Sequence, residues 1–366
     1  MEPFSGSFNQ EDAIFLLKVI DIPPMALETR EYRIQSGQSH YSEMIGPEKP
    51  PDKSYLAVFH QALERNQARL GLDLVKLAAI VAQSRPGPLT LVSIARSGTP
   101  VGVILGRLLK IVFKRDITHY SISVIRDKGV DQNALNYILE RHEPQSIVFV
   151  DGWTGKGVIG RELAHSLGQI KAPKELDPNL AVLADLAGIA GLTASVDDYL
   201  IATSLLNSVV SGLISRTILN PDYIGPFDFH GCVFYQELKD YDLSKWLVDK
   251  VTQYALNQLK TVPDLKAIQN VSLSERLKAA TASAAFMARA KLKYRIQDEN
   301  YIKPGLGESA RVLLRRAPEL LIVRDRLDPD VQPVLILAQE RDVPVAMEPD
   351  LPYRAAALIK RLDRDN

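Results

Sequence analysis

The chain has 366 residues, of which 46% are hydrophobic and 24% charged, and its 44 basic side chains balance its 44 acidic ones. This composition is typical of a globular protein of about two domains, and zero net charge argues against a protein drawn to nucleic acid or membrane by its overall field. A single cysteine, Cys232, excludes an internal disulfide, and no stretch reaches the ~18 apolar residues of a membrane span. We therefore expect a cytoplasmic protein without membrane contact.

The first half of the chain alternates between helix and strand patterns. After a polar, Pro-rich loop at 36–53, of the kind that often binds ligands, a helix is expected over 54–84 with a break near Gly71. Alternating strands and helices predict an α/β fold with a parallel sheet, whose ligands bind at the carboxyl ends of the strands. The strands are expected at 89–95, 119–126, 146–150 and 180–184, and the helices between them at 101–112, 133–142 and 158–167.

The second half begins irregularly and ends in another α/β pattern. Residues 243–296 are mainly helical and predict an exposed arm or bridge. Beyond it we expect a helix at Gly305, then strands at 320–323 and 343–347 and helices at 333–341 and 351–362. The predicted domains are residues 1–250, a helical bridge at 251–299 and a small α/β domain at 300–366.

A Gly-rich loop follows the apolar strand at 146–150. That strand ends in an acid, and the next six residues, GWTGKG, lead directly into a helix. Glycines let backbone N–H groups curl around a phosphate at a helix N-terminus, so the loop predicts a phosphate site, with a tight turn without ligand as the alternative. Its spacing is two residues short of a Walker A loop, which argues against a P-loop NTPase. The candidate residues are Asp151, Trp153, Thr154, Gly155, Lys156 and Gly157.

A second loop of this kind follows the strand at 89–95. Arg96, Ser97, Gly98 and Thr99 predict an anion-binding turn, in which Arg96 supplies a fixed charge and Thr99 caps the next helix. A well-capped helix without ligand is the alternative. Three candidates for the same site come from later in the chain: Asn207, Ser211 and Arg216.

Together the two loops resemble those of type I phosphoribosyltransferases. Residues 95–99 match the family's pyrophosphate loop, and 150–155 match its V-D-D-x-x-T-G-G loop, with Gly152 in place of the second acid. The resemblance implies a phosphoribosyltransferase-like parallel-sheet fold and Mg²⁺-dependent transfer from phosphoribosyl pyrophosphate. It implies that Arg96 and Asp151 are catalytic, with the ribose and the metal at Asp151. The remaining candidates of both loops, together with Arg216, would bind the substrate.

Longer motifs resemble one bacterial family more closely. They span about residues 4–250 and include FSGS at 4–7, HYSISVIR at 119–126, FVDGWTGKG at 149–157 and DFHG at 228–231. They resemble phosphoribosyltransferase-like proteins associated with tellurite-resistance and stress gene clusters, a family also labelled cysteine protease StiP. The resemblance implies a role in stress response.

The protease label suggests an alternative chemistry. Cys232 is the one available thiol, and His230 lies two positions earlier, on the same face if both are in a strand, with Asp228 behind it. Alternatively, His119 or His142 could approach the thiol through space. A small buried thiol in a strand is the commoner role of such a cysteine. The protease hypothesis also leaves the two Gly-rich loops without a role.

The C-terminal domain resembles the pelota/L7Ae-type RNA-binding fold. The signature G-x-N-E-x-x-K at a helix start is matched by Gly305, Glu308 and Arg311, with Gly307 in place of the Asn. Lys303 and Arg315 add positive charge for a phosphate backbone, so the resemblance implies RNA binding, with a solvated helix face as the alternative.

The main hypothesis is therefore a phosphoribosyltransferase that binds phosphoribosyl pyrophosphate or a nucleotide with Mg²⁺. Since Gly152 replaces an acid, a non-catalytic nucleotide- or RNA-binding regulator is one alternative. A cysteine protease that uses Cys232 and His230 is the other.

Overall fold

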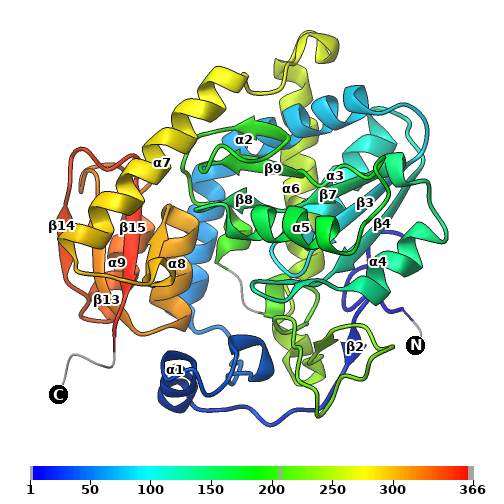
Figure 1. Cartoon of the computed structure of the whole chain (residues 1–366). Helices are drawn as coiled ribbons and strands as arrows, with labels where there is room; N and C mark the ends of the chain where they lie inside the picture. The colour runs from blue at the N-terminus through cyan, green and yellow to red at the C-terminus, as the bar shows by residue number, and fades with distance from the viewer. Residues whose placement is uncertain (1–2, 206–207, 362–366) are drawn as a thin grey trace.

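The computed structural model describes residues 3–205 and 208–361, so Asn207 lies outside the described residues. Figure 1 shows a larger unit around a central sheet and a smaller C-terminal unit in orange and red. The helices are α1 (Leu27–Gln35), α2 (Lys53–Ser84), α3 (Gly98–Ile111), α4 (Gln132–Leu139), α5 (Val158–Gln169), α6 (Ser244–Gln258), α7 (Leu273–Lys293), α8 (Leu306–Arg315) and α9 (Gln332–Glu340).

The central sheet runs in the order β1-β4-β3-β7-β9-β10, with β8 beside β9, and its strand pairs are parallel. This confirms the expected α/β architecture with a parallel sheet, whereas the closer likeness to phosphoribosyltransferases stays a prediction. The strands are β1 (Ile14–Phe15), β3 (Leu89–Ile94), β4 (Ile117–Ile122), β7 (Ile147–Val150), β8 (Trp153–Thr154), β9 (Leu180–Asp185) and β10 (Leu192–Ser195). Two short pairs lie outside it: β2 (Lys18–Val19) with β11 (Gly231–Cys232), and β5 (Val124–Ile125) with β6 (Gly129–Val130).

Both faces of this sheet are buried. In β3, Leu91 belongs to the core on the side of α2, α3 and α6, and its neighbour Val92 to the core on the side of α4 and α5. Successive strand residues point to opposite faces, so a strand covered on both sides is mostly apolar, and its few polar side chains, such as Ser93, are buried. The apolar-rich runs that predicted the strands have this origin.

Helix α2 is continuous through Gly71, and the predicted break there is wrong. A Cβ at Gly71 would lie 2.9 Å from the carbonyl oxygen of Tyr254 in α6. The glycine therefore allows two helix backbones to pack closely, and its lower helix propensity is offset by that packing. The N-terminus of α2 is capped by Asp52, whose carboxylate accepts a hydrogen bond from the Tyr55 N–H at 2.7 Å.

The C-terminal unit contains a four-stranded sheet in the order β12-β15-β13-β14. Its strands are β12 (Ile302–Pro304), β13 (Pro318–Val323), β14 (Val345–Met347) and β15 (Ala355–Ile359). The predicted helix at 351–362 is wrong, because its central residues form the strand β15. All five residues of β15 are buried between two antiparallel neighbours, so tertiary packing overrides the helix propensity of the Ala-rich run.

The helical segment between the two sheets is only partly exposed. In α6, Leu247, Val248 and Val251 are buried in the core of the larger unit. In α7, Phe286 packs against Tyr353 of the C-terminal unit with ring centroids 5.5 Å apart. The expectation of an exposed arm is therefore wrong for α6, whose inward face is apolar. Within the described ranges, the helices are too short or too polar to cross a membrane.

Candidate functional site

The loops after β3 and β7 lie side by side, as expected for neighbouring parallel strands. Ser97 Oγ donates a hydrogen bond to Asp151 Oδ1 at 2.8 Å. A Cβ at Gly98 would lie 2.5 Å from the carbonyl oxygen of Val150. The structure thus brings the two sequence motifs into direct contact, and this contact requires a glycine at position 98.

Asp151 is buried at the centre of this contact, with 7% of its surface exposed. Its Oδ1 also accepts a hydrogen bond from the Gly152 N–H at 2.7 Å. Burial raises the pKa of Asp151 to about 6, although the hydrogen bonds from Ser97 and Gly152 act in the opposite direction. No group of three or more His, Cys, Asp or Glu side chains in the described part of the chain could hold a metal ion, and the expected Mg²⁺ at Asp151 stays a prediction.

The other polar side chains of the β3 loop are used inside the protein. Arg96 is 7% exposed and donates a hydrogen bond to the Ile214 carbonyl at 2.9 Å, with Glu48 4.0 Å away. Thr99 is fully buried, and its hydroxyl hydrogen-bonds that of Ser121 at 2.6 Å. Thr99 lies within α3, so the prediction that it caps the helix is wrong. Packing on β4 sets the direction of its hydroxyl.

The C-terminal unit closely covers the Gly-rich loop. Lys156 Nζ donates a hydrogen bond to the main-chain oxygen of Glu299 at 2.6 Å. A Cβ at Gly155 would meet the side chain of Glu308 at 2.9 Å. Gly157 takes a φ of +79° at the N-cap of α5, a conformation that favours glycine. The predicted phosphate site is therefore in contact with another part of the same chain.

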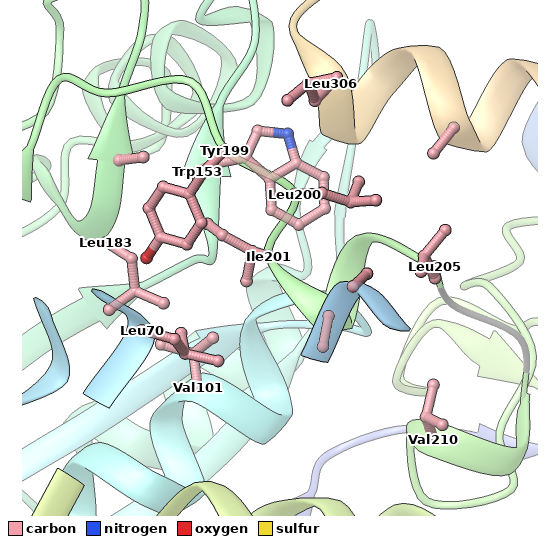
Figure 2. Close-up of a cluster of buried hydrophobic side chains, with 14 of the residues drawn as sticks. Leu70, Val101, Trp153, Leu183, Tyr199, Leu200, Ile201, Leu205, Val210 and Leu306 are labelled. Carbon is pink, nitrogen blue, oxygen red and sulfur yellow. The ribbon is translucent and has the colours of Figure 1, made fainter. Parts of the chain in front are cut away.

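Trp153 and Thr154 form the short strand β8 and face the protein interior. Thr154 Oγ1 donates a hydrogen bond to Asp185 Oδ1 at 2.6 Å. Figure 2 shows the indole of Trp153 close to Leu306, the first residue of α8. A Cβ at Gly307 would lie 3.0 Å from this indole, so the glycine lets α8 approach the ring. Trp153 thus braces the contact between the two units.

Asp198 links the units through two backbone hydrogen bonds. Its Oδ1 accepts from the Leu306 N–H at 2.9 Å, and its Oδ2 accepts from the Arg354 N–H at 2.7 Å. Burial raises the pKa of Asp198 to about 6. Next to it, Gly305 has a φ of +90°, and a Cβ there would lie 2.8 Å from Leu186. Sequence reasoning missed Asp198 because it lies in an irregular segment without a motif.

The charged side chains selected for RNA binding are paired at this contact. Glu308 forms an ion pair with Arg311 at 2.9 Å, and the Arg311 guanidinium lies 6.0 Å from the centre of the Trp153 ring. Arg315 forms an ion pair with Glu48 of the larger unit at 2.8 Å. The end of the signature helix, as well as its start, therefore contacts the larger unit.

Lys303 differs from these residues because its ammonium group forms neither a hydrogen bond nor an ion pair with any residue of the described ranges, although its carbonyl accepts a hydrogen bond from Ser309 Oγ at 3.5 Å. Lys303 is half-buried in β12. Burial lowers the pKa of Lys303 to about 7. The negative charge of Glu308 acts against this shift, and the positive charge of Lys156 adds to it. The ammonium thus lies in a locally cationic environment.

Cys232, in β11, has no exposed surface. Burial raises the pKa of its thiol well above the ordinary value, so the thiol is protonated at neutral pH. His230 Nδ1 hydrogen-bonds Ser123 Oγ at 2.8 Å, and Asp228 forms an ion pair with Lys18 at 2.6 Å. The described residues thus show no hydrogen bond from His230 or Asp228 to Cys232.

Two protein families match the chain. Residues 6–252 match the family described as "Tellurite-like stress resistance cysteine protease StiP". Residues 281–361 match the PELOTA RNA binding domain. The chain is also 38% identical over 371 aligned positions to a protein of Acinetobacter baylyi named "Cysteine protease StiP", an alignment that covers 99% of this chain and 95% of that relative.

These matches overturn the phosphoribosyltransferase hypothesis and favour the protease alternative. The matching family and the relative are both described as cysteine proteases, and neither is described as a transferase. The transferase hypothesis depended on two loops whose polar side chains bond largely within the protein. Because the match spans residues 6–252, the chain belongs to the StiP family of tellurite-like stress resistance cysteine proteases, and it also carries a PELOTA RNA-binding domain at residues 281–361.

Proposed function

We propose that this chain is a cysteine protease with Cys232 as its nucleophile, and that the described conformation is a latent one. The observation that carries this proposal is that Cys232 is the one cysteine in a chain whose family is described as cysteine proteases. A cysteine-dependent activity of this chain can use no other residue.

Latency follows from the state of the thiol. The thiolate is the attacking species, and a buried thiol with a raised pKa does not supply it. The segment is held by hydrogen bonds from the Ile20 N–H to the Cys232 carbonyl at 2.8 Å and from the Lys18 N–H to the His230 carbonyl at 2.9 Å. Activation therefore requires β11 to separate from β2, after which His230 is the candidate base.

Casein hydrolysis by wild type and variants tests this proposal, in buffer and in mild denaturant that loosens β11. We expect Cys232→Ala to abolish hydrolysis and His230→Gln to reduce it. His142→Gln is the matched control, because that ring hydrogen-bonds Tyr120 at 3.0 Å and not the β11 segment. Full activity in Cys232→Ala, or no hydrolysis by wild type under either condition, would refute the proposal.

A second candidate function, RNA binding, is favoured by the PELOTA match over residues 281–361. A helix N-terminus flanked by basic side chains suits a phosphate backbone. Because the start of α8 packs against Asp198 and Trp153, RNA would contact the exposed side of this helix, where Arg311 lies.

Fluorescence anisotropy with single-stranded RNA at several salt concentrations tests RNA binding. We expect Arg311→Glu to weaken binding and to reduce its salt dependence. Arg33→Glu, on the exposed surface of α1, is the control. The same affinity and salt dependence in wild type and Arg311→Glu would argue against RNA binding by this helix.

A further inference from the structure

Arginines from five separate segments surround the loop at 41–48. This loop belongs to the polar, Pro-rich stretch that the sequence marks as a candidate binding loop. The contacts include hydrogen bonds, ion pairs and guanidinium–ring packing. The arginines are Arg30 in α1, Arg96 after β3, Arg126 after β5, Arg216, and Arg315 at the end of α8, and we refer to them as the arginine cluster.

Tyr41 orients two members of the arginine cluster. The Arg126 guanidinium lies 5.0 Å and the Arg216 guanidinium 5.5 Å from the centre of the Tyr41 ring. The Arg126 N–H donates a hydrogen bond to the Tyr41 hydroxyl at 2.9 Å, and Arg216 donates one to the Met44 carbonyl. Arg30 lies against Gly46 of the same loop.

The positive charge of the cluster is only partly neutralised. The carboxylate of Glu48 lies 2.8 Å from Arg315 and 4.0 Å from Arg96, and it also accepts a hydrogen bond from the Ser208 N–H at 2.9 Å. Arg30 and Arg216, by contrast, form no ion pair within 4 Å with any residue that the structure describes. Two half-buried guanidiniums thus lack an ion pair of their own, because the Glu31 carboxylate, whose charge acts on both, is paired with Arg316 at 2.7 Å.

These two charges are also close enough to repel each other. Burial lowers the pKa of Arg216 to about 10, and the charge of Arg30 contributes to this shift. Arg216 still carries its charge at neutral pH. Burial likewise lowers the pKa of Arg30. A buried charge without a partner costs free energy, so an anion placed between the guanidiniums would be stabilising.

We infer that the arginine cluster binds a phosphate group, with Arg30, Arg216 and Arg315 as hydrogen-bond donors. In the absence of phosphate, the Glu48 carboxylate pairs with Arg315, and a bound phosphate takes its place. Guanidiniums present pairs of N–H donors in a planar fork that matches phosphate oxygens. These side chains are half-buried and keep contact with solvent, so a ligand can reach them.

The positions of the three donor arginines in the chain indicate which molecule supplies the phosphate group. Arg315 lies in the segment that matches the RNA-binding domain, whereas Arg30 and Arg216 lie in the segment that matches StiP. A bound phosphate would therefore join the two units. The phosphate chemistry is independent of the proposed functions, but its assignment to an RNA backbone rests on the proposed RNA binding.

Calorimetric titration of the full chain with inorganic phosphate, and separately with a short single-stranded RNA, tests this inference. Arg30→Gln and Arg216→Gln each remove one donor, and Arg33→Gln on the exposed side of α1 is the matched control. We expect phosphate affinity to fall about tenfold in the first two variants and to stay unchanged in the control. Glu48→Gln should bind phosphate more tightly, because it removes the competing charge and keeps an acceptor for the Ser208 N–H.

The two titrations separate the sources of phosphate. If the arginine variants lose affinity for both phosphate and RNA, the site holds the RNA backbone. If they lose affinity for phosphate alone, the site holds a small phosphorylated ligand. If wild type does not bind RNA but its phosphate binding depends on the arginines, the RNA function fails and the phosphate site stands. Wild-type phosphate affinity in Arg30→Gln and Arg216→Gln, with unchanged circular dichroism, would overturn the inference.

Discussion

Replacing Asp151 with Asn is expected to stabilise the folded protein at neutral pH. The hydrogen bonds from Ser97 and from the Gly152 N–H both reach Oδ1, so the amide oxygen of Asn can accept both. The substitution removes the buried charge and replaces Oδ2 with an NH₂ group. The pKa of Asp151 is about 6 instead of 3.8, and at about 1.4 kcal/mol for each pH unit the charged form costs at most about 3 kcal/mol.

The sign of the pH dependence follows from the raised pKa. The protonated Asp151 carboxyl favours the folded state, and this contribution is complete below pH 3.8 and lost as the pH rises through about 6. The gain from Asp151→Asn should therefore be absent near pH 3.8 and complete at neutral pH. Urea unfolding followed by circular dichroism across this range measures it. A destabilised variant at neutral pH, or a difference that does not change with pH, would refute the reasoning.

Asp198→Asn is the matched control for this prediction. Burial raises the pKa of Asp198 to about 6 as well, but its hydrogen bonds are divided between Oδ1, from the Leu306 N–H, and Oδ2, from the Arg354 N–H. In Asn the amide NH₂ would face one of these N–H donors and leave it unsatisfied. At neutral pH the unsatisfied donor should cost about 1–3 kcal/mol and offset the gain from removing the buried charge, so Asp198→Asn should be stabilised less than Asp151→Asn.

Three further predictions concern stability and are measured by thermal or urea unfolding. Gly71→Ala should lower the free energy of unfolding by about 1–3 kcal/mol, because the new Cβ would lie 2.9 Å from the α6 backbone. The control is Gly168→Ala in α5, where the new Cβ has open space, so this variant should be neutral or stabilising. Equal effects of the two substitutions would contradict the packing argument. Tyr353→Phe should cost about 1 kcal/mol, because it removes the 2.6 Å hydrogen bond to Ser283, and an unchanged stability would contradict this. Cys232→Ser should cost about 1–3 kcal/mol, because it buries a hydroxyl in place of an apolar thiol, and an unchanged stability would contradict this.

The central sheet could be predicted because its strands carry a strong local signal. A strand covered on both faces is mostly apolar: β7 is apolar at every position, and β3 is apolar except for the buried Thr90 and Ser93. Two predictions failed where packing overrides local propensity. Gly71 continues a helix because a neighbouring backbone requires the missing Cβ, and the Ala-rich run of β15 forms a central strand because both neighbours pair with it.

The candidate site was harder to predict than the sheet. The contact between Ser97 and Asp151 follows from two neighbouring parallel strands; the sequence predicted that both loops belong to one site, but not this contact. Nothing in the local pattern indicates that Glu48 pairs with Arg315 or that Asp198 binds the start of α8. For the arginine cluster, the sequence indicated Arg96, Arg216 and Arg315 as separate candidates and the polar stretch at 36–53 as a candidate loop, but it did not indicate that they meet.

Local chemistry was sufficient to recognise the strands, the Gly-rich turns and the single thiol of this protein, because each depends on residues a few positions apart. The state of those groups depends on distant partners. Lys156 bonds a carbonyl 143 positions away in the chain, and Asp151 and Cys232 have raised pKa values because remote segments exclude water from them. Burial, hydrogen-bond partners and protonation arise from long-range packing, which the sequence motifs do not record.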